Sequence, residues 1–441
     1  MAATTTLAET GATPEPGAAT PVVAAPDVGW RDFFVDERLE KLIALALENN
    51  RDLRVTALNV ERARALHDIR RADRVPSVDA AGVVARQHTG GDDGSTSTQY
   101  ALDVGITSYE IDLFGRVRSL SHAALEDFFA SEEARRSTQL ALIAAVGDAY
   151  LTLAADRELQ KLAEETVTSE EESFRLTEKR YELGALSGLE VSQARTTVES
   201  ARVDAARFEG NVAQDLNLLT LLVGGPIDPA QLPERLDAAV SGIAPLPSEL
   251  PSEALLRRPD VLRAEHFLRS ANASIGAARA AYFPRIGLTA SAGVASDELS
   301  DLFGSGSGTW SFIPRITVPI FQGGRLRAGL RAARVDRDIA IALYEQAIQI
   351  GFREVADALA LTRTLAKQRA AQQALVEAAR NAFELSNARY RSGRDSYLLA
   401  LDSQRTFYGA QQGFIAIRLA EESNRLDLYR ALGGGWKERT E

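Results

Sequence analysis

The sequence predicts a mainly α-helical protein with a small β part, built as a tandem duplication. Three observations lead to this fold class. Matched positions recur at a nearly constant separation through most of the 441 residues. Long spans without proline, from Ser77 to Gly225 and after Pro319, carry helical periodicity. In each half, two segments with strand-like alternation interrupt the helices.

The duplication is visible in five pairs of positions. They are NRDL at 50–53 with RPDV at 258–261, Pro76 with Pro284, Arg116 with Arg325, Asp148 with Asp357, and Tyr181 with Tyr390. Their separations are 208, 208, 209, 209 and 209 residues. Such small drift over more than a hundred residues indicates an internal repeat.

The repeat and the proline distribution divide the chain into five parts. We expect a flexible leader over 1–28, a first repeat over 29–225, a linker over 226–259, a second repeat over 260–435 and a tail over 436–441. Seven of the fifteen prolines fall between Pro226 and Pro259, which marks the linker.

The helices are predicted to be unusually long. We expect helices at 52–73, 115–182 and 188–223 in the first repeat, after a short one that begins near Asp36, and at 260–282, 325–391 and 396–432 in the second. At about 1.5 Å per residue, the span from Arg116 to Tyr181 measures about 99 Å. The two shorter helices of each repeat, stacked end to end, nearly match the long helix beside them. The molecule is therefore expected to be elongated.

The second long helix carries two apolar stripes on nearly opposite sides. One contains Ile341, Tyr344, Ile348, Phe352, Val355 and Leu359, and the other contains Ile339, Leu343, Ala347 and Ile350. A two-stranded coiled coil needs only one such stripe. Two stripes predict neighbours on both sides, as in a wall of helices that curves into a tube.

The strands lie in hairpins at 77–113 and 285–321, with individual strands expected at 285–296 and 309–321. Strands of about 10–14 residues that are apolar on one face resemble those of membrane barrels. Four strands cannot close a barrel, and an open edge cannot lie in lipid. Several chains would therefore share one barrel. The alternative is a soluble hairpin packed on the helical body.

Composition excludes several functions. The net charge of −11 argues against a nucleic-acid partner, and the absence of cysteine excludes thiolate chemistry. The four histidines share no metal-ligand spacing, and glycine-rich 304–308 lacks the Lys-Ser/Thr of a phosphate loop. The glutamates at 164, 165 and 170–172 are interpreted mainly as a solvated helix face. We expect no enzyme, metal or cofactor, no transmembrane helix and no secretory signal at the N-terminus.

Five segments together resemble the TolC-like outer-membrane factors, in particular the lipoprotein (NodT/OprM-like) branch that serves resistance-nodulation-division (RND) efflux pumps. They are Trp30–Val55, EIDLFGRVR at 110–118, RRPDVLRAE at 257–265, PIFQGGRLR at 319–327 and ARYRSGRDSYLLALDSQR at 388–405. Members of that branch carry a signal peptide and an acylated cysteine. Neither is found in this sequence, and we expect either that the leader was trimmed or misassigned or that this member lacks the anchor.

The resemblance implies a homotrimeric α-helical barrel continuous with a shared 12-stranded transmembrane β-barrel, with four strands per chain. The barrel would lie in the lipid of a Gram-negative outer membrane, and the helices would form a periplasmic tunnel with the linker in an equatorial belt. The implied partners are a periplasmic adaptor, or membrane fusion protein, and an inner-membrane RND transporter. The implied function is a passive exit duct for drugs or other small molecules.

The resemblance also assigns residues. Leu398 and Asp402, one helical turn apart, would constrict the periplasmic end, and the polar contacts of Tyr390 and Arg391 would hold it closed. The adaptor would meet the turns, at Gly184, Ala185 and Leu186 and at Gly393 and Arg394. From the sequence alone, Asp402 is more typical of a solvated helical aspartate, and only the resemblance favours the gate. A soluble coiled-coil scaffold and an exit duct for type I protein secretion remain alternative functions.

Overall fold

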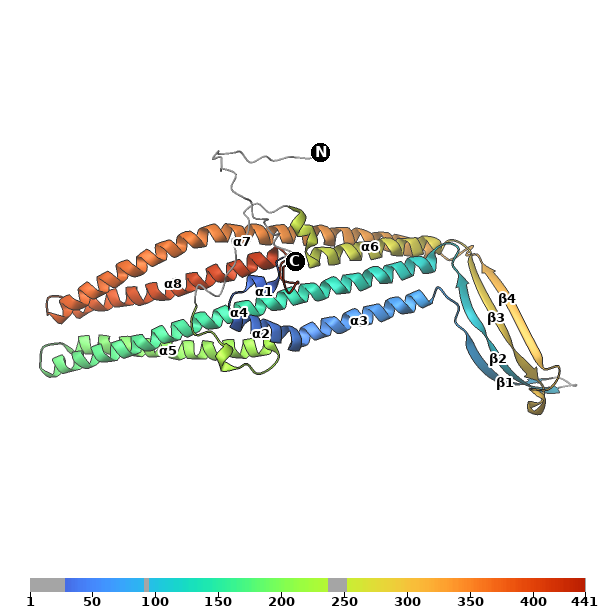
Figure 1. Ribbon diagram of the computed structural model, residues 1–441, viewed down its shortest axis with the longest axis horizontal. Helices are drawn as coiled ribbons and strands as arrows, with labels where there is room; N and C mark the ends of the chain where they lie inside the picture. Colours follow the sequence, from blue (N-terminus) through green and yellow to red (C-terminus); the bar gives the residue numbers. More distant parts are fainter. Residues whose placement is uncertain (1–27, 91–94, 237–251, 441) are drawn as a thin grey trace, which may run out of the picture.

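The computed structural model describes residues 28–90, 95–236 and 252–440, and it shows an elongated chain with a small sheet at one end (Figure 1). The α-helices are α1 (Trp30–Phe33), α2 (Glu37–Asn49), α3 (Arg51–Ala72), α4 (Arg116–Glu182), α5 (Gly188–Val223), α6 (Pro259–Ala280), α7 (Arg325–Arg391) and α8 (Tyr397–Ala431). The strands are β1 (Asp79–Thr89), β2 (Ser95–Ile111), β3 (Arg285–Ser296) and β4 (Gly308–Thr317). Short 3-10 turns lie at Pro229–Gln231, Ser252–Arg257 and Leu299–Asp301.

The two long helices have the predicted lengths. Helices α4 and α7 contain 67 residues each and begin at the matched residues Arg116 and Arg325. Helices α3 and α5 follow one another along α4, and α6 and α8 follow one another along α7 (Figure 1). The helices end in two hairpin turns at the end of the molecule opposite to the sheet.

The long helices form a layer rather than a compact bundle. Helix α4 contacts α3 and α5 as well as α6 and α8, so it has neighbours on both sides. Helix α7 packs on α6 and α8. Val355 of its first stripe is buried against α8 and the 3-10 turn Ser252–Arg257, whereas Phe352 of the same stripe is 49% exposed. Its second stripe stays open in the single chain, where Ile339 is 53% and Leu343 52% exposed.

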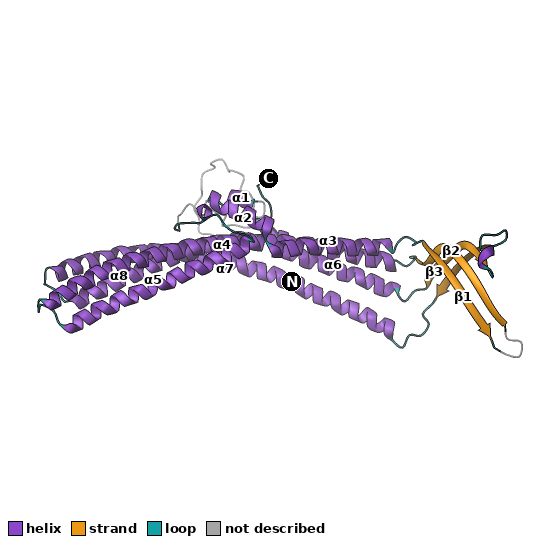
Figure 2. Cartoon of the chain, turned by 90° about the horizontal axis from the view of Figure 1, so that it is seen from below, coloured by secondary structure: helices purple, strands orange, loops and turns teal. Residues whose placement is uncertain are grey.

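The largest hydrophobic core lies at the middle of the long axis. Helices α1 and α2 project from one side of the layer (Figure 2) and pack on α4. Trp30, Leu42, Ile143 and Tyr150 are all at most 2% exposed there. The C-terminal segment closes this region, because the backbone N–H of Trp30 donates to the Lys437 carbonyl at 3.0 Å. Both ends of the described chain are thus anchored at the middle of the molecule.

The four strands form one antiparallel sheet in the order β1-β2-β3-β4. The register places Gly82, Leu102 and Val294 in one row, and Val104, Ala292 and Trp310 in another. Because side chains alternate between the faces of a strand, these residues share one apolar face. The opposite face carries Asp79, Asp103, Thr289, Ser291, Arg285 and Arg315. The predicted division into an apolar and a polar face is confirmed.

Two strand predictions were wrong in extent. Strand β4 ends at Thr317 instead of residue 321. Thr317 pairs with Arg285, the first residue of β3, so the residues after Thr317 have no partner in this ladder. Strand β2 contains 17 residues, more than the predicted maximum of about 14, because the threonine- and serine-rich segment after the turn joins the strand.

One stretch of 18 residues in α4 is apolar enough to cross a membrane. However, 67% of that stretch is buried inside the protein, as expected for the core segment of a long helix. The stretch therefore gives only weak support for a membrane-spanning helix.

Candidate functional site at the helical tips

Both helical tips use the same chain reversal. The N–H groups of Gly184 and Ala185 donate to the carbonyls of Tyr181 and Arg180, at 2.8 and 2.9 Å. At the second tip, the N–H groups of Gly393 and Arg394 donate to the carbonyls of Tyr390 and Arg389, at 2.9 and 3.0 Å. This pair of bonds defines a Schellman motif, which satisfies the last carbonyls of a helix.

The glycines are required by the backbone. The φ angle is 74° at Gly184 and 72° at Gly393, in the left-handed region that side chains disfavour. The predicted adaptor-contact residues Gly184, Ala185, Gly393 and Arg394 are exposed at these turns, and Leu186 is half-buried. The structure thus brings each set together at the extreme end of the molecule.

The two tips are linked through Arg180. Its guanidinium lies 5.2 Å from the centre of the Tyr390 ring, and its Nη2 donates to the Arg391 carbonyl at 3.3 Å. Arg391 contributes its backbone to this link, whereas its side chain is exposed. The sequence predictions did not include Arg180. Its counterpart in the second repeat, Arg389, also lies just before a tip, and this match could have indicated it.

Tyr390 belongs to a small buried cluster. It contacts Tyr397, with 5.3 Å between ring centres, and both pack with Ala194, Ala400 and Leu401. Burial raises the pKa of Tyr397 to about 12. The Tyr390 hydroxyl is buried and has no hydrogen-bond partner among the described residues. Tyr390 therefore acts by packing and through its ring, which differs from the polar contact that the resemblance implies.

Leu398 and Asp402 lie on the other face of α8. Leu398 is 58% exposed and Asp402 is also exposed, while Tyr397, Ala400 and Leu401 on the same turns are buried. The structure therefore places Leu398 and Asp402 together on a surface that the single chain leaves open, one helical turn apart as predicted.

An ion pair stabilises the turn between α7 and α8. Arg389 Nη2 donates to Asp395 Oδ1 at 2.9 Å across the turn, and a second hydrogen bond joins Arg389 Nε to the same carboxylate. These hydrogen bonds lower the pKa of Asp395. The sequence predictions missed this pair, although the six-residue spacing of opposite charges across a turn could have indicated it.

The prediction that the glutamates at 164, 165 and 170–172 form a solvated helix face is wrong for one residue. Glu164, Glu165 and Glu172 are exposed, but the Glu170 residue is only 2% exposed. Ala163, Glu170 and Thr177 are seven residues apart and all buried, so the heptad position could have indicated this. Glu170 lies where α4 meets the neighbouring helices α5 and α8.

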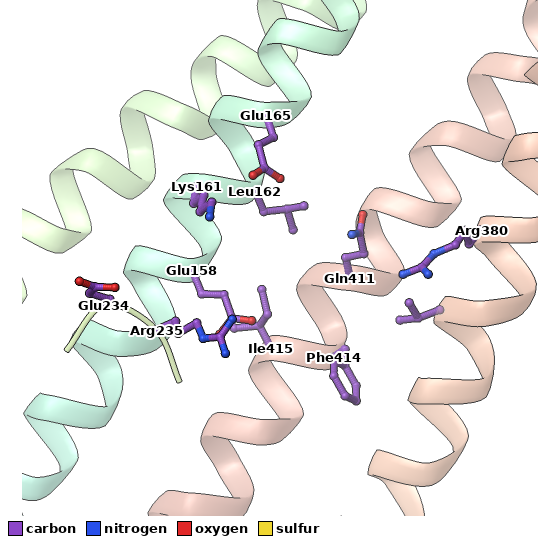
Figure 3. Close-up of a pocket in the computed structure, with 11 residues that line it drawn as sticks. Glu158, Lys161, Leu162, Glu165, Glu234, Arg235, Arg380, Gln411, Phe414 and Ile415 are labelled. Carbon is purple, nitrogen blue, oxygen red and sulfur yellow. The ribbon is translucent and has the colours of Figure 1, made fainter. Parts of the chain in front are cut away.

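A cavity of about 490 Å³ lies nearer the middle of the molecule than the tips do (Figure 3). Helices α4, α7 and α8 and the chain after α5 line it, with Lys161, Glu165 and Arg380 among its charged groups. Glu158 in its wall accepts a hydrogen bond from Arg418 Nη1 at 3.0 Å. In residues 28–90, 95–236 and 252–440, no three His, Asp or Glu side chains are placed to hold a metal ion. The cavity contains none of the predicted site residues.

A family model described as "Outer membrane efflux protein" matches residues 42–225 and again residues 250–434. The double match agrees with the predicted duplication. A toluene efflux pump outer membrane protein, TtgC of Pseudomonas putida, is 50% identical over 424 residues, covering 95% of this chain and 87% of the relative. OprJ, an outer membrane protein of Pseudomonas aeruginosa, is 44% identical over 423 residues, with 93% and 86% covered.

The fold is also similar to a solved channel. The open state of the Neisseria gonorrhoeae MtrE outer membrane channel has a TM-score of 0.88 and 39% identity, and the match covers 96% of this chain and 95% of that one. These similarities favour the efflux function over the soluble scaffold and over the protein-secretion duct.

Proposed function

This chain belongs to the outer membrane efflux protein family and is an outer-membrane efflux channel component, and from that premise we propose that three copies close into one tube. The proposal rests mainly on surfaces of the single chain that have no packing or pairing partner. Strands β1 and β4 each have one edge without a partner strand in the described part of the chain. An unpaired strand edge in lipid is costly, so the edges of neighbouring copies would pair.

The exposed side chains support the same assembly. Trp310 is 81% and Ile316 67% exposed on the apolar face of the sheet, where lipid would cover them. The open stripe of α7 would pack on the free side of α3 and α5 in the next copy. Val55 and Leu58 on α3 are exposed there, at 56% and 57%. Twelve strands and a continuous helical wall would result.

Leu398 and Asp402 would form the periplasmic gate of this tube. Three leucines around the axis would narrow the passage and exclude water. Three aspartates would create a negative potential that favours cations in the narrow neck. Support comes from their exposure on one face of α8 beside the buried cluster that fixes the helix.

The two Schellman turns would contact the periplasmic adaptor, which would link the tube to an inner-membrane RND transporter. Their support is their position at the extreme end of the molecule and their shared geometry, which gives a three-fold assembly six similar turns. The duct itself would be passive. Small molecules such as the toluene named for one relative are the proposed cargo.

Single-channel conductance in lipid bilayers tests the gate. We expect Asp402→Ala to reduce cation selectivity and Leu398→Ala to raise the conductance, because each removes one part of the constriction. The matched control is Glu384→Ala, an exposed carboxylate on α7 away from the gate, which is expected to leave both quantities unchanged. Wild-type conductance and selectivity in both gate variants would contradict the assignment.

A further inference from the structure

Glu170 lies where two helical hairpins meet. Helices α4 and α5 form one hairpin, α7 and α8 form the other, and α4 contacts α8 between them. The Glu170 residue is 2% exposed, and its Oε2 atom has no hydrogen-bond partner among the described residues. A buried carboxylate without a partner is costly when it is ionised. Its role is not explained by the gate or by the tips.

The charged and titratable groups around Glu170 come from three helices. Glu170 lines a polar cavity of about 280 Å³ with Asp204 of α5 and with Arg405 and Tyr408 of α8. Asp204 already has two partners. Arg207 forms an ion pair with it at 2.9 Å, and the Tyr408 hydroxyl donates a hydrogen bond to it at 3.3 Å. Tyr397 of α8 is the other titratable neighbour, and Tyr390 of α7 contacts its ring.

Burial raises the pKa of Glu170 to about 7, although the positive charge of Arg405 opposes the shift. The folded form therefore favours the protonated acid, relative to the unfolded chain. The stabilisation of this contact is complete below about pH 4.5 and is lost progressively as the pH rises to about 7. Above that pH, Glu170 is a buried negative charge between the packed hairpins, and its cost favours their separation.

We propose that Glu170 is a pH-sensitive latch between the two hairpins, which holds the tips together when protonated and loosens them when ionised. The connection to the gate runs through α8. Tyr397, Ala400 and Leu401 pack against the first hairpin, whereas Leu398 and Asp402 occupy the opposite face of the same turns. A movement of α8 away from α4 therefore moves Leu398 and Asp402 as well. This last step rests on the proposed function, but the latch itself does not.

The separation of the tips tests the latch. The chain has no cysteine, so spin labels can be attached at Leu183→Cys and Arg394→Cys, two exposed tip positions. Co-expression with excess unlabelled chain keeps the measured distance within one copy. We expect the distance to increase as the pH rises from about 4.5 to about 7 and to stay constant above that range. In Glu170→Gln, whose amide stays neutral, the short distance is expected at every pH.

The matched control is Glu178→Gln, which removes an exposed carboxylate from the same helix and should titrate like the wild type. Equal thermal unfolding midpoints of Glu170→Gln and wild type at acidic pH would show that the variant is folded. A wild-type distance that stays constant over the pH range, or a Glu170→Gln variant that titrates like the wild type, would overturn the proposal. Because the distance does not depend on conduction, failure of the gate assignment in bilayers is a separate result.

Discussion

At the residue scale, the tips depend on two glycines in left-handed conformation. At Gly184 and Gly393, an added Cβ atom would meet nothing within 4 Å, so space does not demand glycine at either turn. The requirement lies in the backbone, because φ is 74° and 72°. An L-residue in this conformation brings its Cβ close to the following carbonyl oxygen. The effect of substitution at these sites therefore isolates backbone strain.

Gly393→Ala is expected to destabilise the chain by about 1 kcal/mol through this strain. Gly409→Ala is the matched control, because Gly409 lies inside α8, also with nothing within 4 Å of a Cβ. Alanine in a helix interior stabilises by roughly 0.5–1 kcal/mol relative to glycine. The two substitutions should shift the thermal unfolding midpoint in opposite directions. A loss of stability in both would indicate contacts rather than strain.

The residues of the tips were predictable to different degrees. Gly184 and Gly393 follow from repeat matching, because each sits at the same position after a long helix. The link from Arg180 to the Tyr390 ring joins residues 210 positions apart, and no local pattern indicates it. The burial of Glu170 was missed because carboxylates are usually exposed, and residue type was given more weight than the heptad position.

At the element scale, each repeat stacks its two shorter helices through the same kind of hydrogen bond. Asn50, which caps α3, donates from Nδ2 to the Leu222 carbonyl near the end of α5 at 2.9 Å. Its counterpart Arg258, before α6, donates from Nη1 to the Ala431 carbonyl at the end of α8 at 2.7 Å. Each bond satisfies a carbonyl that a helix end leaves without an intrahelical partner. The repeat thus preserves the contact while the residue type changes.

Arg258→Met is expected to destabilise the protein by about 1.5–3 kcal/mol, because it removes the charged hydrogen bonds of a buried guanidinium. The guanidinium also bonds Asp260 and Glu354, at 2.7 and 2.8 Å from Nη2, and its side chain is only 8% exposed. Guanidinium chloride unfolding measures the change. Arg269→Met is the control, since Arg269 pairs with Glu265 at the surface and such pairs contribute at most about 1 kcal/mol. Equal losses in both variants would contradict a structural role specific to Arg258.

The helices were more predictable than the strands. Glycine and proline mark the helix ends, so α5 and α7 begin and end at the expected residues. The start of β2, Ser95–Gln99, pairs with Ala85–Thr89 of β1, and the end of β4 at Thr317 pairs with Arg285 of β3, 32 residues away. Both ends therefore depend on a register that a local pattern does not contain. Strand β4 ends at Thr317 because its partner there, Arg285, is the first residue of β3.

At the scale of the whole molecule, the elongated shape follows from helix length, whereas the tube requires surfaces that one chain does not complete. The two stripes of α7 predicted neighbours on both sides. The first stripe packs within the chain only in part, since Val355 is buried but Phe352 is 49% exposed, and the second, with Ile339 and Leu343, is exposed. Exposed apolar stripes of this length mark an interaction surface. Neither sequence periodicity nor a single chain can specify how many copies close the wall.

Ile339→Asp tests whether a second copy covers this stripe. A carboxylate buried without a partner between helices costs several kcal/mol, and a closed assembly would repeat that cost at every interface. We therefore expect the variant to lose the trimer in detergent, measured as the protein mass by light scattering or native mass spectrometry. Glu345→Lys, an exposed charge reversal on α7 outside the stripe, is the control and should stay trimeric. A trimeric Ile339→Asp variant at the same protein concentration would mean that this stripe faces lumen or solvent, and the wall would have to close through another surface.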